Sequence, residues 1–422
     1  MSIFEGSDAL RKKAIITGIV VLIIFILSYF LFFREMLRKS RTDEVRQKVE
    51  QSSTKETVRL VEGNRSPLSG EECENWNKRP VAVMQPSDMQ ARPAAGFSEA
   101  DMVFELPAYT SSVTRLMGVY VCNIPKEIGA MRSSRHDYIH IAKGLDAIFV
   151  HWGGSVFALE ILKKGVIDNI DCLVYSGKYC DRWDWENDPV MRMEDSGHVK
   201  SEALLSGIQD LGYRKDTNFE GYPHQLDAPL EERPEGGNLR VAFANPYDVE
   251  YEYDKESNSY IRFWNEIADK DRNNGNRIAP KNVVVLIAKS EQINLSTDYV
   301  ARGVDNPWDL VPEDHRDGIG SGVGRYNNLE FGDPWFDTVD TGQAFYYMNG
   351  KEFRGTWKKN KEDINSKLYF YDEAGKEIPF VVGQVWVDVL EPGQALRWTV
   401  KSEEASPVQE NTNAEAGSGT TE

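Results

Sequence analysis

Three arginines and one histidine in the first half of the chain are the side chains best suited to holding an anion. Arg115 lies near the start of an apolar stretch, and Arg132 and Arg135 bracket the polar turn RSSR. His151 ends the apolar run DAIFVH. Guanidinium groups bind phosphate and carboxylate through paired hydrogen bonds, and a histidine can donate a hydrogen bond or a proton. The pattern indicates an anion site, with salt bridges to the many carboxylates of the chain as the competing interpretation.

Small residues beside these side chains would let a ligand approach the backbone. Ser133 lies within the arginine turn, and Gly153, Gly154 and Ser155 follow the histidine. Glycines after a strand permit close approach. The segments that follow both turns have helical periodicity, and the amino terminus of a helix offers free N–H groups and the positive end of a dipole. We therefore include these four residues in the predicted anion site.

A strand–helix–strand–helix succession would position the site residues. The expected elements are strands at Ile128–Met131 and Asp146–His151 and helices at Asp137–Leu145 and Val156–Lys163. When such strands are parallel, the turns that follow them lie at one edge of the sheet, at the carboxyl ends of the strands. We expect Arg132, Arg135 and His151 to meet at this edge, with the two arginine side chains pointing away from the sheet core.

Other chemistries have incomplete residue sets. His136 and His140 have H-x-x-x-H spacing, but no third ligand is evident, so we predict no metal site. Ser133 and Ser155 lack a Ser-His-Asp order. The chain contains neither GxxxxGK[ST] nor GxGxxG, and we predict no cofactor. Because no catalytic set is complete, whether the protein is an enzyme stays open.

The amino terminus favours a membrane protein. The chain has 422 residues and a formal charge of −18, which argues against general nucleic-acid binding. Ala14–Phe33 is an uncharged run of 20 residues, long enough to span a bilayer once. A cleaved signal peptide is the alternative, but its apolar core would be shorter and would end in small residues. The flanking basic residues lean slightly toward a cytoplasmic body.

The fold class expected for the remainder is a mixed α/β amino-terminal domain followed by a β-rich carboxyl-terminal domain. Short strands such as YIRFW and VWVDVL, separated by turn residues, fill the second half. The predicted segments are a short amino-terminal segment at 1–13, a transmembrane helix at 14–33, a stalk at 34–75, the α/β domain at 76–230, the β-rich domain at 238–399 and a disordered acidic tail at 400–422.

The four cysteines allow two disulfides in three connectivities, or they could be buried free thiols. Cys172 and Cys180 are eight residues apart and are the most plausible local pair. No pair has CxxC spacing, which disfavours a zinc knuckle.

The order of motifs resembles the YerB-like bacterial lipoprotein family, whose two domains have no assigned function. The motifs are RPVAVM, ARPAAGFSEADMVFE, VTRLMGVY, IGAMRSSR, HWGGS and IDNID in the first half, and YEYD, NVVVL, GTWK, DEAGKEI and GQVWV in the second. The resemblance covers about Trp76 to Leu390. The resemblance implies an exported protein that is anchored by a lipid. Here the apolar run Ala14–Phe33 would replace the lipid anchor. The body would then be extracytoplasmic, although the flanking basic residues lean toward a cytoplasmic body. The resemblance also adds Arg192 and His198 to the candidate ligand-binding residues.

A shorter likeness, to the LytR-CpsA-Psr phosphotransferases of the cell envelope, implies arginines that hold a lipid pyrophosphate. We therefore expect a single-pass, membrane-anchored protein of the bacterial cell envelope that binds an anionic ligand, a glycan or a lipid-linked phosphate, at its arginine-rich strand ends. The alternatives are a phosphotransferase or hydrolase acting on such a ligand, and a scaffold that binds envelope proteins.

Overall fold

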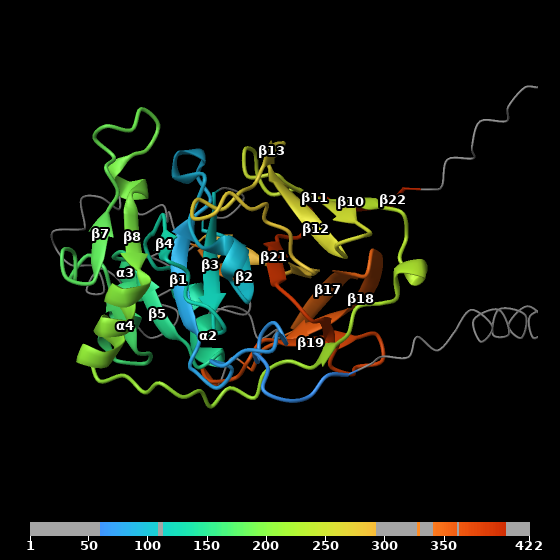
Figure 1. Ribbon diagram of the computed structural model, residues 1–422, viewed down its shortest axis with the longest axis horizontal. Coiled ribbons are helices and arrows are strands. Elements are labelled where there is room, and N and C mark those ends of the chain that lie inside the picture. Colours follow the sequence, from blue (N-terminus) through green and yellow to red (C-terminus); the bar gives the residue numbers. More distant parts are fainter. Residues whose placement is uncertain (1–59, 109–112, 293–326, 330–340, 361–362, 402–422) are drawn as a thin grey trace, which may run out of the picture. The chain divides into compact units, whose positions relative to one another are not determined.

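The computed structural model describes residues 60–108, 113–292, 327–329, 341–360 and 363–401 (Figure 1). The expected transmembrane run Ala14–Phe33, most of the expected stalk and nearly all of the expected tail lie outside these residues. Within them, no helix is both long enough and apolar enough to cross a membrane.

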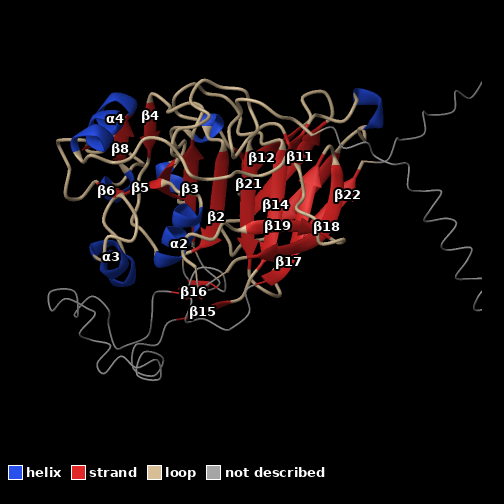
Figure 2. Ribbon diagram, turned by 90° about the horizontal axis from the view of Figure 1, so that it is seen from below, coloured by secondary structure: helices blue, strands red, loops and turns tan. Residues whose placement is uncertain are grey.

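One ten-stranded sheet runs through the described body (Figure 2). In spatial order its strands are β19 (Tyr369–Asp372), β18 (Lys351–Lys358), β17 (Thr341–Met348), β14 (Asn282–Ile287), β21 (Val385–Leu390), β2 (Met102–Pro107), β3 (Thr114–Tyr120), β1 (Val81–Pro86), β5 (Ile148–His151) and β6 (Asn169–Asp171). The central strands β14 and β21 read NVVVLI and VWVDVL, and β-branched residues buried on both faces favour this position. Strands from both halves of the chain therefore share one sheet.

A second, five-stranded sheet packs over the carboxyl-terminal part of the first. Its order is β13 (Ile267–Ala268), β12 (Ser259–Trp264), β11 (Val249–Asp254), β10 (Gly237–Val241) and β22 (Leu396–Val400). In β11 every second side chain is buried, which is the pattern of a strand with one covered face. Tyr251 and Trp264 of this sheet share a core with Val283 and Trp386 of the large sheet.

The three α-helices of the described residues all follow the first strands and cover both faces of the large sheet. They are α2 (His136–Gly144), α3 (Val156–Lys163) and α4 (Ser201–Asp210). Ile139 of α2 and Leu162 of α3 pack on one face with Phe104, and Leu204 of α4 packs on the other with Val150. The described strands are far more numerous than the helices, so both halves are built mainly from β-sheet.

A small three-stranded sheet corrects one sequence expectation. Its strands are β4 (Glu127–Gly129), β8 (Gly197–Lys200) and β7 (Cys180–Arg182). The strand expected at Ile128–Met131 does not join the large sheet, because Ile128 pairs with Val199 of β8. The same pairing keeps Gly197–Lys200 extended, and α4 begins at Ser201.

The remaining described elements are short. They are the strand pairs β15 (Ser290–Gln292) with β16 (Asn327–Leu329) and β9 (His224–Gln225) with β20 (Phe380–Val381), and the 3₁₀ turns η1 (Met89–Ala91), η2 (Phe97–Glu99), η3 (Met193–Asp195) and η4 (Leu230–Glu232).

Two disulfides tie loops to the body. Cys172 bonds to Cys180, as expected from their spacing, and Cys73 bonds to Cys122. Part of the expected stalk also belongs to the body, since Leu68 is fully buried in the core. The body therefore begins before the predicted boundary at residue 76.

Candidate functional site

The backbone of Arg132 lies where strands β1 and β5 separate. The parallel pairing of the two strands extends to Val83 and Val150. Beyond it, Arg132 N–H donates to Met84 O at 2.9 Å, and Trp152 N–H donates to Arg132 O at 3.1 Å. Arg132 thus bridges the carboxyl ends of two parallel strands. The predicted shared edge is confirmed, although β1 and β5 form it and not β4 and β5.

The guanidinium group of Arg132 is held between two carboxylates without hydrogen bonding to either. Its Nε is 3.1 Å from Asp195 Oδ1, and its Nη2 is 3.8 Å from Asp88 Oδ2. The nearer contact lacks hydrogen-bond geometry, and both of its atoms remain without a hydrogen-bond partner. The side chain is 21% exposed. The Nε–H group of Arg132 therefore keeps its donor capacity.

The two carboxylates differ in their surroundings. Asp88 accepts hydrogen bonds from Arg115 Nη1 at 3.2 Å and from Tyr247 OH at 3.0 Å. Asp195 is only 1% exposed, and burial raises the pKa of its carboxyl group, with Arg132 opposing the shift. Burial, together with the charge of Arg115, lowers the pKa of Arg132. We call Asp88, Arg115, Arg132 and Asp195 the strand-end cluster.

Trp152 and a third arginine, Arg182, flank the strand-end cluster. The guanidinium carbon of Arg182 lies 4.2 Å from the centre of a Trp152 ring, within cation–π range. Arg182 also donates to Ser196 Oγ at 3.2 Å and to the carbonyl of Met193. The indole packs on Gly197, where a Cβ would lie 2.6 Å from a ring carbon, so only glycine fits. These contacts fix the loop that carries Asp195.

Arg135 and His151, two of the predicted site residues, are buried. Contrary to expectation, the guanidinium of Arg135 folds back on its own turn and donates to Ser134 O at 3.0 Å. His151 is fully buried, with Nδ1 2.7 Å from Gly153 O and Nε2 3.2 Å from Asn169 Oδ1. Both side chains therefore hold the turns beside Arg132 in place.

The small residues of the predicted site also stabilise these turns. Ser155 caps α3 by accepting a hydrogen bond from the N–H of Ala158 at 3.3 Å. Gly153 has a φ of +63° and donates its N–H to Asp171 Oδ1 at 2.8 Å. Ser133 and Gly154 are half-buried in the same two turns.

The two residues added by family resemblance lie on a neighbouring surface. His198 stacks on Trp183 with ring centres 5.1 Å apart, and the guanidinium carbon of Arg272 lies 4.3 Å from the centre of a Trp183 ring. Burial lowers the pKa of His198. Arg192 is exposed in the loop that precedes Asp195. The sequence did not indicate that His198, Trp183 and Arg272 meet, because they come from separate segments.

Three buried polar atoms near these contacts lack a hydrogen-bond partner among the described residues: Ser134 Oγ, Trp152 Nε1 and His198 Nδ1. Buried polar groups in proteins are nearly always hydrogen-bonded, to protein, water or ligand. The described residues contain no group of three His, Cys, Asp or Glu side chains arranged to hold a metal ion. Ser134 Oγ and Trp152 Nε1 can each donate a hydrogen bond, and His198 Nδ1 can donate or accept one according to its tautomer.

Comparison with known proteins identifies the family. Residues 68–211 match the model "Protein of unknown function (DUF3048) N-terminal domain", and residues 239–306 and 323–387 match the corresponding C-terminal domain. The chain is 26% identical over 331 residues to "Putative lipoprotein YerB" of Bacillus subtilis (strain 168), an alignment that covers 77% of this chain and 86% of that protein. The crystal structure of the Bacillus subtilis YerB protein matches with a TM-score of 0.62 and 23% identity, over 79% of this chain and 99% of that one. The resemblance seen in the motifs is confirmed, and the chain belongs to the YerB-like family of proteins with DUF3048 amino-terminal and carboxyl-terminal domains.

Proposed function

We infer that this protein is an extracytoplasmic envelope protein, anchored through Ala14–Phe33, that binds an anionic ligand at its strand-end cluster. The similar Bacillus protein is described as a lipoprotein, which supports a position outside the membrane. The two disulfides support it too, because such bonds persist mainly in oxidising compartments. The ligand is a phosphate or carboxylate group carried by a glycan or a lipid.

The observation that carries this proposal is the state of the Arg132 side chain. Buried arginines elsewhere in the body, such as Arg79 and Arg262, donate hydrogen bonds to carboxylates or carbonyls. Arg132 is partly buried, with 21% of its side chain exposed, and its contacts to Asp88 and Asp195 are ion pairs without hydrogen bonds. A positioned guanidinium fork with free donor capacity is suited to two-point recognition of an anion.

The bound anion would compete with the two aspartates for Arg132. A phosphate group presents several acceptor oxygens, so it can accept from Arg132 the hydrogen bond that Asp195 does not accept. Trp152 Nε1 and Ser134 Oγ, both buried and without partners among the described residues, are further donors beside the same turn. Binding is expected to be moderate, because Asp88 and Asp195 offset part of the positive charge.

Titration calorimetry of the full-length protein with inorganic pyrophosphate tests the proposal. We expect Arg132→Ala to weaken binding by about one to two decades, since a charge-assisted hydrogen bond contributes roughly 1.5–3 kcal/mol. Arg240→Ala is the matched control, because Arg240 is an exposed arginine on the five-stranded sheet, paired with Asp248 and Glu250. Arg240→Ala should bind pyrophosphate like the wild type.

The opposite result would show that Arg132 stabilises the fold and does not bind the ligand. Removing one partner of a buried ion pair destabilises a protein by roughly 3–5 kcal/mol. A large fall in the melting temperature of Arg132→Ala, with pyrophosphate affinity unchanged, would contradict the proposal. Absence of pyrophosphate binding to the wild type would contradict it as well.

A further inference from the structure

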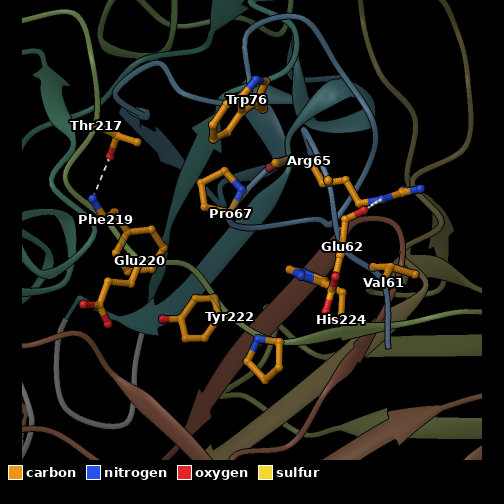
Figure 3. Close-up of a pocket in the computed structure, with 13 residues that line it drawn as sticks. Val61, Glu62, Arg65, Pro67, Trp76, Thr217, Phe219, Glu220, Tyr222 and His224 are labelled. Carbon is orange, nitrogen blue, oxygen red and sulfur yellow. Dashed lines mark hydrogen bonds between the residues drawn. The ribbon is translucent and has the colours of Figure 1, made fainter. Parts of the chain in front are cut away.

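A second candidate site lies at the other end of strand β1. A pocket of about 280 Å³ opens between the segment Val61–Pro67 with Trp76 and the segment Thr217–His224 (Figure 3). Trp76 precedes the amino end of β1, whereas Asp88 of the strand-end cluster follows its carboxyl end. A six-residue strand spans about 20 Å. The pocket is therefore separate from the strand-end cluster.

The walls of the pocket are aromatic and proline rings held in fixed positions. Tyr222 is buried and donates its hydroxyl to Leu368 O at 3.0 Å, and Phe219 packs edge-on against it at 5.5 Å. Pro67 forms another wall. The indole of Trp76 is 37% exposed, so it presents a flat apolar surface to a ligand.

Two carboxylates supply the polar part of the pocket. Glu62 and Glu220 are exposed, lie on different sides of the opening in Figure 3, and form no ion pair with a described residue. The cation of the pocket is already engaged, since Arg65 donates to Gly70 O at 3.0 Å and lies 3.6 Å from Glu72. The carboxylates of Glu62 and Glu220 can therefore accept hydrogen bonds from a ligand, whereas Arg65 is already engaged and offers little to an anion.

We propose that this pocket binds one ring of a neutral glycan, stacked on Trp76 and hydrogen-bonded through its hydroxyls to Glu62 and Glu220. The volume is at the small end of ligand pockets, which run from about 300 to 1,000 Å³, so a single ring fits better than a large ligand. A sugar ring presents C–H groups on its faces and hydroxyls around its edge, which matches a pocket lined by an exposed indole and two carboxylates.

A cationic ligand is disfavoured by a cation already in place. Lys367 Nζ lies 5.0 Å from the centre of the Tyr222 ring and donates to Gly221 O at 2.8 Å. It also pairs with Glu377 at 2.5 Å. The cation–π capacity of Tyr222 is therefore used by the protein itself, and Trp76 alone would not form a cage around an ammonium group.

The test is binding of chitotriose, a neutral glycan of N-acetylglucosamine, to the full-length protein in a detergent without a sugar head group. We expect wild-type protein to bind it, Trp76→Ala to bind at least tenfold more weakly, and Trp76→Phe to recover most of the loss. The double variant E62Q/E220Q should bind several-fold more weakly with an unchanged melting temperature. Trp185→Ala is the control, because Trp185 is a half-buried tryptophan outside the pocket and should bind normally.

The outcomes separate this site from the strand-end cluster. Arg132→Ala should retain chitotriose binding, and Trp76→Ala should retain pyrophosphate binding. The proposal is overturned if chitotriose does not bind the wild type, or if Trp76→Ala and E62Q/E220Q bind it as tightly as the wild type does. Competition by choline chloride would overturn it in favour of a cationic ligand.

Discussion

Glu105 of β2 and Asp388 of β21 are direct neighbours in the large sheet, and both side chains are fully buried. They lie at the junction of the two family domains, since β2 belongs to the first matched region and the second matched region ends at residue 387, within β21. Glu105 contacts Arg262 at 2.5 Å, and Asp388 accepts a hydrogen bond from Tyr251 OH at 2.9 Å. Arg262 pairs with Glu105 and Asp269, whereas burial and the nearby charge of Glu105 raise the pKa of Asp388 well above its ordinary value and favour its protonated form.

We predict opposite effects for neutralising these two residues. Asp388→Asn should leave stability at neutral pH unchanged or raise it, because the asparagine keeps an acceptor for Tyr251 and removes a carboxyl that resists ionisation. Glu105→Gln should destabilise the protein by about 3–5 kcal/mol, because it removes a charged partner of the fully buried Arg262. Urea denaturation of both variants at pH 7 measures the difference, and equal losses would refute the assignment.

The pH dependence of the wild type has a defined sign at Asp388. Because the folded pKa is raised, the folded state binds more protons than the unfolded state, so stability falls as pH rises from the ordinary carboxyl value of 3.8 toward the raised one. Asp388→Asn should flatten this part of the stability profile. A profile identical to that of the wild type would show that Asp388 is ionised at neutral pH.

Asp195 should control anion binding through Arg132. Its raised pKa means that it becomes protonated earlier than an ordinary aspartate as pH falls, while Asp88, Glu194, Arg115 and Arg132 remain its charged neighbours. Sulfate, which stays ionised throughout, is therefore expected to bind more tightly as pH falls through the pKa of Asp195. Asp195→Asn should bind sulfate about fivefold more tightly at pH 7, equivalent to roughly 1 kcal/mol. Calorimetric titration at several pH values measures both effects, and weaker binding in the variant would contradict the model.

The two disulfides should differ in their contributions to stability. Cys73 and Cys122 are 49 residues apart, whereas Cys172 and Cys180 are 8 apart. Loop-closure entropy predicts losses of about 4 and about 2.5 kcal/mol when each pair is replaced by serines. Guanidinium denaturation of the two double variants, compared with the wild type, measures the order. If the variant without the Cys172–Cys180 disulfide lost more stability than the other, native contacts would outweigh chain entropy.

Topology can be tested on intact cells. We expect external protease to digest the body while the amino terminus remains protected, because the proposed anchor Ala14–Phe33 precedes an extracytoplasmic body. A cytoplasmic protein serves as the control for cell integrity. Protection of the body until the cells are lysed would place it inside and would also remove the proposed access to envelope ligands.

The sequence alone determined the local elements and the family. Helical spacing placed Val156–Lys163 as the structure has it, and the apolar runs that become β5 and β21 were recognisable as strands. The Cys172–Cys180 pair followed from its short separation. Local periodicity carries this information because it reflects which faces of an element are buried.

Only the tertiary structure decided which strands are neighbours and which charges meet. Apolar strands such as β14 and β21 are buried on both faces, so their sequences do not specify a partner, and the joining of both domains through β2 and β21 could not be foreseen. For the same reason β4 was placed in the wrong sheet. The ion pairs of Arg132 involve Asp88 and Asp195, far away along the chain in both directions. Such contacts depend on the path of the whole chain, because a charged side chain pairs with whatever the packed elements bring within a few ångströms of it.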